Sequence, residues 1–196
     1  MKQLRKRIKG TCHGINKGLL CTLRKISCEK VIMSTTLKRQ PEDFHIRFAE
    51  EKDVPIIVAL IKELAAYEKL EDKVQANEMV VKDSIFRNKA AEIIIGEYEG
   101  APVGYAVFFQ NYSTFTGRPG MFIEDIYVKP HLRRKGFGEQ LFKFMARLAV
   151  KRGYARVEWT CLDWNKPSIT FYKKMGAEAL PDWTTYRLSG EALRKL

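Results

Sequence analysis

The sequence lacks any apolar run close to the roughly 18 residues that a membrane-spanning helix needs. It is also poor in cysteine, with four in 196 residues, three of them within the first 28 positions. No Cys-x-x-Cys pair or complete set of metal ligands accompanies them, so neither a disulfide framework nor a structural metal site is indicated. These absences argue against a membrane protein and a disulfide-rich secreted protein. They predict a reducing, cytoplasmic setting and no metal.

Acidic residues are nearly missing from the first 40 positions, which hold 11 Lys or Arg and a single acid, Glu29. The remainder carries 24 basic and 22 acidic residues, so the net charge of +12 belongs mostly to this leader. A nucleic-acid-binding fold is expected to carry its positive charge on the domain itself. We therefore expect no nucleic-acid partner and no membrane association for the folded part.

Composition divides the chain into two parts. Residues 1–42 are predicted to be a basic, disordered extension. Two alternatives stay open for them: translation that starts at Met33 instead of Met1, and an organelle-targeting presequence. With 45% hydrophobic and 11% aromatic residues overall, the chain can bury a core, and residues 43–196 are predicted to form one domain.

Hydrophobic periodicity predicts an α/β domain from residue 44 onward. Strands are expected over 44–49, 91–98, 103–109, 121–128, 155–162 and 183–188. Helices are expected to follow three caps, Asp53, Asn77 and Asn165, with Pro55 and Pro167 in first turns. A strongly periodic helix is expected between Gly138 and Gly153.

The segment Arg133-x-x-Gly136-x-Gly138 joins the strand 121–128 to that periodic helix. A strand that leads through glycines into a helix N-terminus aims unpaired N–H groups and the positive helix end at one point, which suits a phosphate. Arg133, Arg134 and Lys135 add cations there. The segment has neither the Gly-Lys-Ser/Thr of a Walker motif nor a complete dinucleotide fingerprint, and two glycines in a basic turn can simply turn the chain.

Two acids, Glu124 and Asp125, adjoin on the strand before this loop. Neighbours on a regular strand point to opposite faces, so at most one of them should face a given pocket. Such an acid could attract a cationic amine and take its proton, directly or through a water. An amine with a pKa near 10.4 is nucleophilic in only about one molecule in a thousand near neutral pH, a deficit of roughly 4 kcal/mol, so a base is needed. A solvated strand end is the alternative reading of the pair.

The strings IEDIYVKPHLRRKGFGEQL and DWNKPSITFYKKMGA together resemble the GCN5-related N-acetyltransferase (GNAT) superfamily. Within it, the chain is most similar to the spermidine/spermine N1-acetyltransferase and thialysine (diamine) acetyltransferase group. The resemblance covers residues 46–188. It implies a mixed, mostly antiparallel seven-stranded sheet flanked by helices and splayed at an acetyl-CoA site, with no metal and commonly a homodimer.

The resemblance also implies roles for individual residues. Tyr172, which the sequence pattern alone would read as a core aromatic, corresponds to the general acid for the departing thiolate, and Glu124 to an acid at the amine. Substrate contacts are expected from Tyr67, Glu68, Glu124, Asp125 and Trp159. Cofactor contacts are expected from Ile126, Tyr127, Val128, Arg133, Arg134, Lys135, Gly136, Phe137, Gly138, Glu139, Asn165, Lys166, Pro167 and Ser168.

One departure bears on the substrate. Where the polyamine enzymes carry Asp-Pro-Trp, this chain reads Ser113-Thr114-Phe115, which is more like the thialysine branch. The acid expected to bind the far nitrogen of a polyamine is missing, so a lysine-like amine or a short diamine is favoured over spermidine and spermine. The alternatives are acetylation of a protein amine and, outside enzymes, a basic-tailed protein that binds nucleic acid or a membrane surface.

Overall fold

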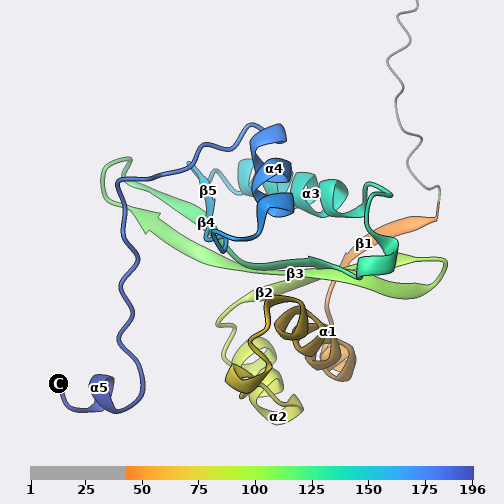
Figure 1. The fold of residues 1–196 in the computed structure, drawn as a ribbon, viewed down its shortest axis with the longest axis horizontal. Helices are drawn as coiled ribbons and strands as arrows, with labels where there is room; N and C mark the ends of the chain where they lie inside the picture. The colour runs from red at the N-terminus through yellow and green to blue at the C-terminus, as the bar shows by residue number, and fades with distance from the viewer. Residues whose placement is uncertain (1–42) are drawn as a thin grey trace, which may run out of the picture. The chain divides into compact units, whose positions relative to one another are not determined.

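The computed structural model describes residues 43–196 (Figure 1). The predictions made for residues 1–42 lie outside the described residues. The described part forms one five-stranded sheet in the order β1-β2-β3-β4-β5. Neighbouring strands are antiparallel except for β4 and β5, which are parallel and are joined through helix α3. The α/β class expected from the sequence is confirmed.

The strands are β1 (Phe44–Phe48), β2 (Glu92–Tyr98), β3 (Ala101–Ser113), β4 (Arg118–Val128) and β5 (Val157–Trp159). The α-helices are α1 (Val54–Glu68), α2 (Glu78–Val81), α3 (Phe137–Lys151), α4 (Lys166–Lys174) and α5 (Gly190–Arg194). A π-helical turn, η3 (Lys82–Arg87), continues α2. Short 3₁₀ turns are η1 (Glu51–Asp53), η2 (Glu71–Lys73) and η4 (Pro130–Leu132).

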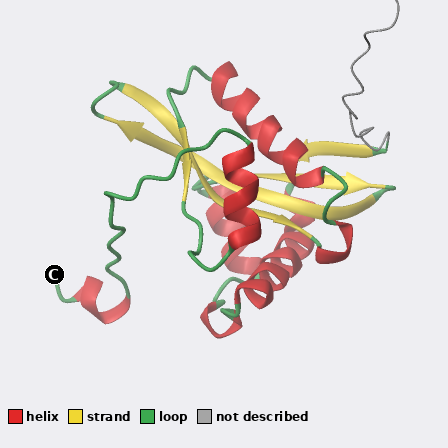
Figure 2. Cartoon of the chain, turned by 45° about the horizontal axis from the view of Figure 1, so that its top comes forward, coloured by secondary structure: helices red, strands yellow, loops and turns green. Residues whose placement is uncertain are grey.

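Helices cover both faces of the sheet (Figures 1 and 2). On one face α1 and α2 bury a cluster that includes Ile57, Leu60 and Ile95. On the other face α3 and α4 pack on a second cluster, in which Leu141 and Met145 of α3 are fully buried. The four helical residues named here are stripe positions of the predicted amphipathic helices α1 and α3, so burial of each of these helices against the sheet supplies most of its stability.

A β-bulge interrupts β4 at the acidic pair. Val107 of β3 lies opposite Asp125, and the next residue, Phe108, lies opposite Ile123, so Glu124 is the extra residue. Ile123 belongs to the core cluster under α3, whereas Asp125 is hydrogen-bonded to Tyr105, a member of the cluster under α1. The bulge therefore reverses the face on which β4 side chains lie.

The parallel pairing of β4 with β5 is short. It covers only Met121–Ile123 against Val157–Trp159. Beyond Ile123 the two strands separate, so the end of β4 is paired through β3 on one side only. The sheet is thus open next to the glycine loop, as expected for this fold.

Three strand predictions differ from the structure. The described residues form five strands instead of seven, and β5 is shorter than the expected 155–162. Residues 183–188, expected to form a strand, have no ladder partner among the described residues. Strand propensity in Trp-Thr-Thr-Tyr is realised only when a neighbouring strand supplies hydrogen bonds, and no strand within residues 43–196 pairs with this segment.

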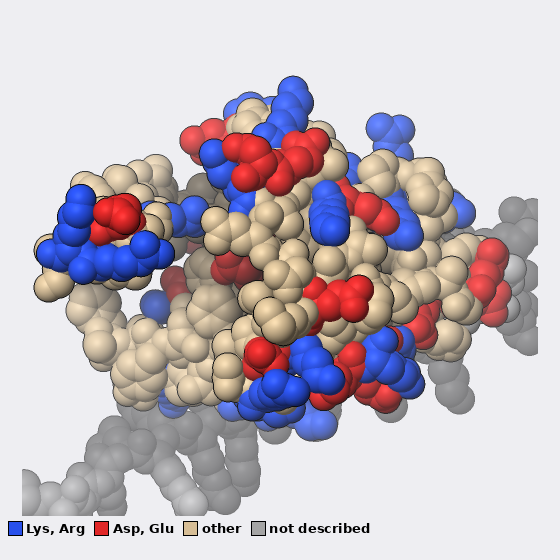
Figure 3. All heavy atoms as spheres, turned by 90° about the horizontal axis from the view of Figure 1, so that it is seen from below, with Lys and Arg blue, Asp and Glu red and all other residues tan. Residues whose placement is uncertain are grey.

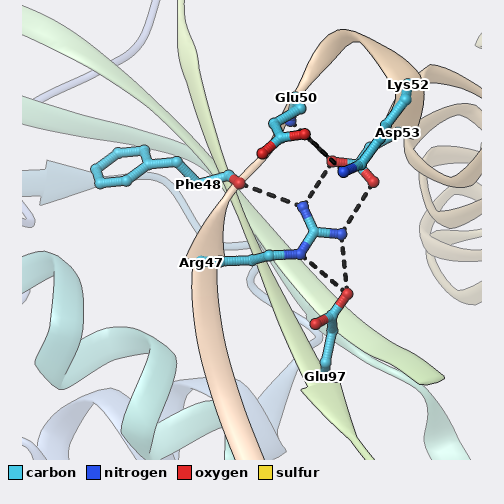
Figure 4. A network of polar contacts seen from close by, with 6 residues as sticks. All are labelled: Arg47, Phe48, Glu50, Lys52, Asp53 and Glu97. Atoms are coloured by element: carbon cyan, nitrogen blue, oxygen red, sulfur yellow. Dashed lines mark hydrogen bonds and ion pairs between the residues drawn. The ribbon is translucent and has the colours of Figure 1, made fainter. Parts of the chain in front are cut away.

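An ion-pair network joins the start of α1 to the sheet (Figure 4). The Arg47 guanidinium donates to both carboxylate oxygens of Asp53, at 2.7 and 2.9 Å, and to Glu97 at 2.8 and 3.0 Å. Asp53 also accepts the N–H of Glu50 at 2.8 Å. Asp53 is the predicted N-cap residue of α1, but its carboxylate bonds to Arg47 and Glu50 and makes no capping bond to the helix.

The face that carries α1 and α2 shows basic and acidic side chains interspersed (Figure 3). Ion pairs such as Lys82–Glu51 and Arg87–Asp83 lie among them. Within residues 43–196, no helix is both long and apolar enough to cross a membrane.

Candidate active site

The glycine loop has the backbone geometry of an anion site. Arg134 and Gly136 adopt positive φ values of 66° and 91°, and α3 begins immediately afterwards at Phe137. The N–H of Gln140 donates to the carbonyl of Gly136, so the N–H groups of Phe137 and Gly138 precede the first intrahelical bond. Arg134 and Lys135 are exposed beside this turn. The loop and helix end therefore fit a pyrophosphate.

The opened end of β4, with Ile126, Tyr127 and Val128, lies next to this loop in the chain. Arg133 donates from Nε to the carbonyl oxygen of Val128 at 2.9 Å. Because β5 has already separated from β4, this edge can supply backbone groups to an extended ligand in the manner of a strand. The loop and the strand end together fit a long molecule with a phosphate group and an amide-containing arm, which is the chemistry of acetyl-CoA.

Two carboxyl groups lie on the α1 side of the opening. Asp125, half-buried, accepts a 2.9 Å hydrogen bond from the hydroxyl of Tyr105. Burial raises the pKa of Asp125, and the charge of Glu124 raises it further. Glu68, the last residue of α1, also has a raised pKa, caused by burial and by the charge of Asp125. Among the described residues, neither carboxyl group has an ion pair with a basic side chain. The pair is therefore a site that a cation would stabilise.

Tyr172 lies on α4, with its ring in an aromatic cluster. The ring centroid is 4.9 Å from that of Trp159 and 6.1 Å from that of Phe142. Burial raises the pKa of the Tyr172 hydroxyl well above its usual value, and nearby Cys161 and Glu68 raise it further. The hydroxyl thus stays protonated throughout the neutral range.

Asn165 connects α4 to α1. Its side-chain oxygen accepts the N–H of Ser168 at 3.3 Å, the predicted cap, and the hydroxyl of Tyr67 at 3.2 Å. Asn165 is one of the few buried polar residues among those described. Lys166 and Pro167 are exposed on the first turn of α4 and Ser168 is half-buried. The Tyr67–Asn165 bond therefore links the predicted substrate contacts Tyr67 and Glu68, the substrate wall, to the predicted cofactor contacts at residues 165–168, the second cofactor segment.

Glu124 is exposed at the bulge, whereas Asp125 points inward to Tyr105. The structure thus brings Glu68, Asp125 and Tyr172 into one electrostatic group and leaves Glu124 at its rim. Trp159 contributes through its ring contact with Tyr172. Glu139 pairs with Lys143 at 2.7 Å along α3. Within residues 43–196, no group of three or more His, Cys, Asp or Glu residues is arranged to hold a metal ion.

Sequence reasoning missed two residues of this group. Tyr105 reads as one aromatic in an apolar strand, and only the register of β3 with β4 reveals its bond to Asp125. Cys161 follows β5 and influences Tyr172 electrostatically. Its pKa is raised by burial and by Glu68 and Asp163, so the thiol is protonated and unreactive at neutral pH.

Comparison with known proteins agrees with this geometry. Residues 57–177 match the acetyltransferase (GNAT) family. The chain is 38% identical over 163 residues to the thialysine N-epsilon-acetyltransferase of Sus scrofa, covering 77% of this chain and 95% of the relative. It is 30% identical over 197 aligned residues to the L-ornithine N5-acetyltransferase of Arabidopsis thaliana, covering 77% and 86% of the two chains.

Solved structures share the fold at low sequence identity. An integron cassette protein from the mobile metagenome of V. cholerae superposes with a TM-score of 0.66 at 24% identity, over 78% of this chain and 96% of that one. An aminoglycoside acetyltransferase from a soil metagenome superposes with a TM-score of 0.65 at 17% identity, over 75% and 97%.

The loop before α3, the opened β4 edge and the match over residues 57–177 agree with one another. Membership of this family implies acetyl-CoA as cosubstrate. The chain belongs to the acetyltransferase (GNAT) family and is an N-acetyltransferase.

Proposed function

We propose that the enzyme transfers the acetyl group of acetyl-CoA to a primary amine of a small cationic substrate, a lysine-like amine or a short diamine. The observation that carries the proposal is the pair Glu68 and Asp125, two partly desolvated carboxyl groups with raised pKa values and no basic partner among the described residues. An ammonium group next to them would restore their ionised forms and offset their mutual repulsion.

The curated relatives support this substrate class. Their names include thialysine and L-ornithine acetyltransferases, whose stated substrates are small amino acids with a side-chain amine. Residues 113–117 at the tip of the β3–β4 hairpin also support this substrate class. They include no acid that could bind the distant second ammonium of a polyamine. Phe115 at this tip is 94% exposed. We therefore favour lysine-like amines over spermidine and spermine.

Acetyl-CoA, when bound, supplies the acetyl group as a thioester. We assign its pyrophosphate to the amides of residues 134–139 and its pantetheine arm to the backbone of Ile126, Tyr127 and Val128. The side chains of Arg133, Arg134 and Lys135 add positive charge. Asn165, Lys166, Pro167 and Ser168 form the second cofactor segment.

The chain's own residues then move two protons. Glu68 and Asp125 hold the amine in its charged form, which opposes the loss of its proton. Glu124, exposed to solvent at the bulge, accepts that proton through a water, so binding and deprotonation fall to different carboxylates. Tyr172 keeps its proton because burial raises its pKa, and it donates this proton to the departing sulfur. The attacking nitrogen loses its second proton to solvent, and Tyr172 regains a proton from solvent. No covalent enzyme intermediate is needed, since the amine attacks the thioester directly.

A panel of amines tests the proposal. Thialysine, lysine, ornithine, putrescine, spermidine and an aminoglycoside are each incubated with enzyme and acetyl-CoA, and release of free CoA is measured. We expect the highest kcat/KM for thialysine, lysine or ornithine. Turnover of none of these amines would defeat the small-amine proposal, and turnover of a peptide lysine or N-terminus alone would favour the protein-acetylation alternative.

We further propose that the enzyme acts as a homodimer. The segment after α4 exposes large apolar side chains, with Trp183 74% and Tyr186 91% exposed, and β5 is an edge strand of the described sheet. A second copy of this chain is the partner that both features fit, because an edge strand and an unpaired β-prone segment are complementary. Light scattering should give the dimer mass, and W183S/Y186S should give the monomer mass. A monomeric parent chain would contradict the proposal.

We also propose that residues 43–196 are the catalytic domain and that the enzyme works in the cytoplasm. A chain that begins at residue 43 should retain acetyl transfer. Any binding of nucleic acid or anionic vesicles by the full chain should disappear with this deletion, because the excess charge lies in residues 1–40.

A further inference from the structure

The side chain of Arg133 is held at three points. Its guanidinium carbon lies 4.1 Å from the ring centroid of Tyr67 and 5.6 Å from that of Tyr127. Its Nε donates a 2.9 Å hydrogen bond to the carbonyl of Val128. A planar guanidinium can stack on one ring and donate within its own plane at the same time, which a lysine ammonium cannot do. Arg133 is therefore fixed in direction as well as in charge.

Tyr67 in turn contacts the segment that begins helix α4. The Tyr67 hydroxyl donates to Asn165 at 3.2 Å, and its ring centroid is 6.0 Å from that of Trp164. Asn165 caps α4, the helix that carries Tyr172. The next residue after Tyr67 is Glu68, one of the two carboxyl groups assigned to the amine. A continuous set of contacts thus runs from the glycine loop through Arg133 to the substrate wall and to α4.

We propose that Arg133 is a positioning residue that holds Tyr67, and with it Glu68, in place for the amine and couples acetyl-CoA binding to amine binding; this inference rests on the proposed function. The loop amides that follow Arg133 are those assigned to the pyrophosphate. Binding there fixes the backbone from which Arg133 projects, and so fixes the cation–π contact with Tyr67. Because coupling between two sites is reciprocal, a bound amine must strengthen acetyl-CoA binding by the same factor.

The kinetic test replaces Arg133 with lysine, which keeps the charge near the phosphates but loses the stack and the Nε bond. A cation–π contact is worth roughly two- to thirtyfold in an equilibrium constant. We expect R133K to raise the KM for the amine about tenfold at saturating acetyl-CoA and, by reciprocity, to raise the KM for acetyl-CoA by a similar factor at saturating amine. The Kd for acetyl-CoA without amine should change less than threefold. R134A is the matched control: it removes a neighbouring loop cation, so it should raise the KM for acetyl-CoA and leave the KM for the amine nearly unchanged.

A double-mutant cycle shows whether Arg133 acts through Tyr67. Y67L should reproduce the amine effect of R133K, and R133K/Y67L should be no worse than the poorer single variant. Effects that multiply in the double variant, or an R133K variant that raises only the KM for acetyl-CoA, would overturn the inference. If thermal unfolding shows that R133K does not fold, comparison of Y67F with Y67L replaces it as the test. Y67F keeps the aromatic ring that stacks on Arg133, so it should bind the amine better than Y67L.

A second measurement needs no turnover. Trp164 lies next to Tyr67 and directly before Asn165, so acetyl-CoA should change its fluorescence in both proteins but less in R133K. W164F identifies the signal. The same fluorescence change in both proteins would overturn the inference. An enzyme that acetylates no amine while showing the Arg133-dependent change would instead defeat only the proposed function.

Discussion

The hydroxyl of Tyr105 donates a 2.9 Å hydrogen bond to Oδ2 of Asp125 from the neighbouring strand. This bond exists because the bulge at Glu124 turns Asp125 to the α1 side of the sheet, opposite to Ile123. On a regular strand, residues 123 and 125 would share a face, and Asp125 would point into the apolar core under α3. One inserted residue thus places this carboxyl group beside Tyr105 on the α1 side of the sheet instead of in the apolar core under α3.

Asp125→Asn should weaken amine binding while leaving acetyl-CoA binding intact. The amide keeps the size of the side chain and can still accept from Tyr105, but it cannot attract an ammonium group. We expect the KM for the amine to rise about tenfold or more, since a charged hydrogen bond contributes roughly 1.5–3 kcal/mol. Steady-state kinetics with each substrate varied in turn will check this. An unchanged KM for the amine would remove Asp125 from the substrate site.

The same carboxyl groups predict how activity depends on pH. The pKa values of Asp125 and Glu68 are raised by burial and by nearby negative charge, so each becomes protonated at a higher pH than an ordinary Asp or Glu. The ionised forms that attract the amine exist above these raised values. The kcat/KM for the amine should therefore fall as the pH decreases through them, and Asp125→Asn should change this acidic limb. An acidic limb identical in the parent and the variant would contradict the assignment.

Tyr172→Phe tests the proton donor. The substitution keeps the ring contacts with Trp159 and Phe142 and removes only the hydroxyl, so stability should change little. We expect kcat to fall roughly 100-fold or more, because positioned general acids contribute about 10² to 10⁴, with acetyl-CoA affinity preserved. A more basic buffer should not restore the turnover of this variant. Unchanged turnover would show that solvent, not Tyr172, protonates the leaving sulfur.

Local sequence signals predicted the elements better than they predicted the site. Asn77 and Asn165 cap their helices as expected, because capping depends only on the next three residues. The face of Asp125 could not be read locally, since a bulge is a property of the register between β3 and β4. The unpaired segment 183–188 shows the same limit, because its pairing depends on a partner strand and not on its own composition.

The substitution Gly104→Ala tests whether the close packing of β3 against the end of β4 matters for stability and for acetyl-CoA binding. Gly104 lies opposite Val128, and a Cβ atom there would overlap the carbonyl oxygen of Tyr127 and lie 3.2 Å from the Cα of Val128. Gly104→Ala must push this backbone outward. We expect a loss of about 1–3 kcal/mol in the free energy of unfolding, typical of overpacking, and a higher KM for acetyl-CoA.

Gly100→Ala is the control for Gly104→Ala. Gly100 lies in the turn between β2 and β3 and has a φ of 76°, but no atom beyond its chain neighbours lies within 4 Å of the position of its added Cβ. The Gly100→Ala variant should lose about 1 kcal/mol in its free energy of unfolding, through backbone strain alone. Its KM for acetyl-CoA should not change. Equal kinetic effects of the two variants would show that the end of β4 is not the sensitive element.

Asp53 should be the charged residue on which the stability of the α1–sheet junction depends. It is 2% exposed and receives two guanidinium bonds from Arg47 (Figure 4). The bond to Arg47 lowers the pKa of Asp53, although burial opposes it. A carboxyl group with a lowered pKa contributes stability above its ordinary pKa of about 3.9 and loses it as the pH falls through the lowered value. Asp53→Asn should cost about 2–3 kcal/mol in urea unfolding at pH 7, because it leaves Arg47 without its buried partner.

The exposed pair Lys52–Glu50, on the same turn, is the matched comparison for Asp53. Lys52→Ala should leave the urea midpoint unchanged, since solvent screens this pair. The difference between Asp53→Asn and the parent should shrink as the acid limit is approached, because protonation of Asp53 removes the same charge in the parent. If the difference stayed constant down to that limit, the cost would arise from packing or from the Glu50 N–H bond, and not from the ion pair with Arg47.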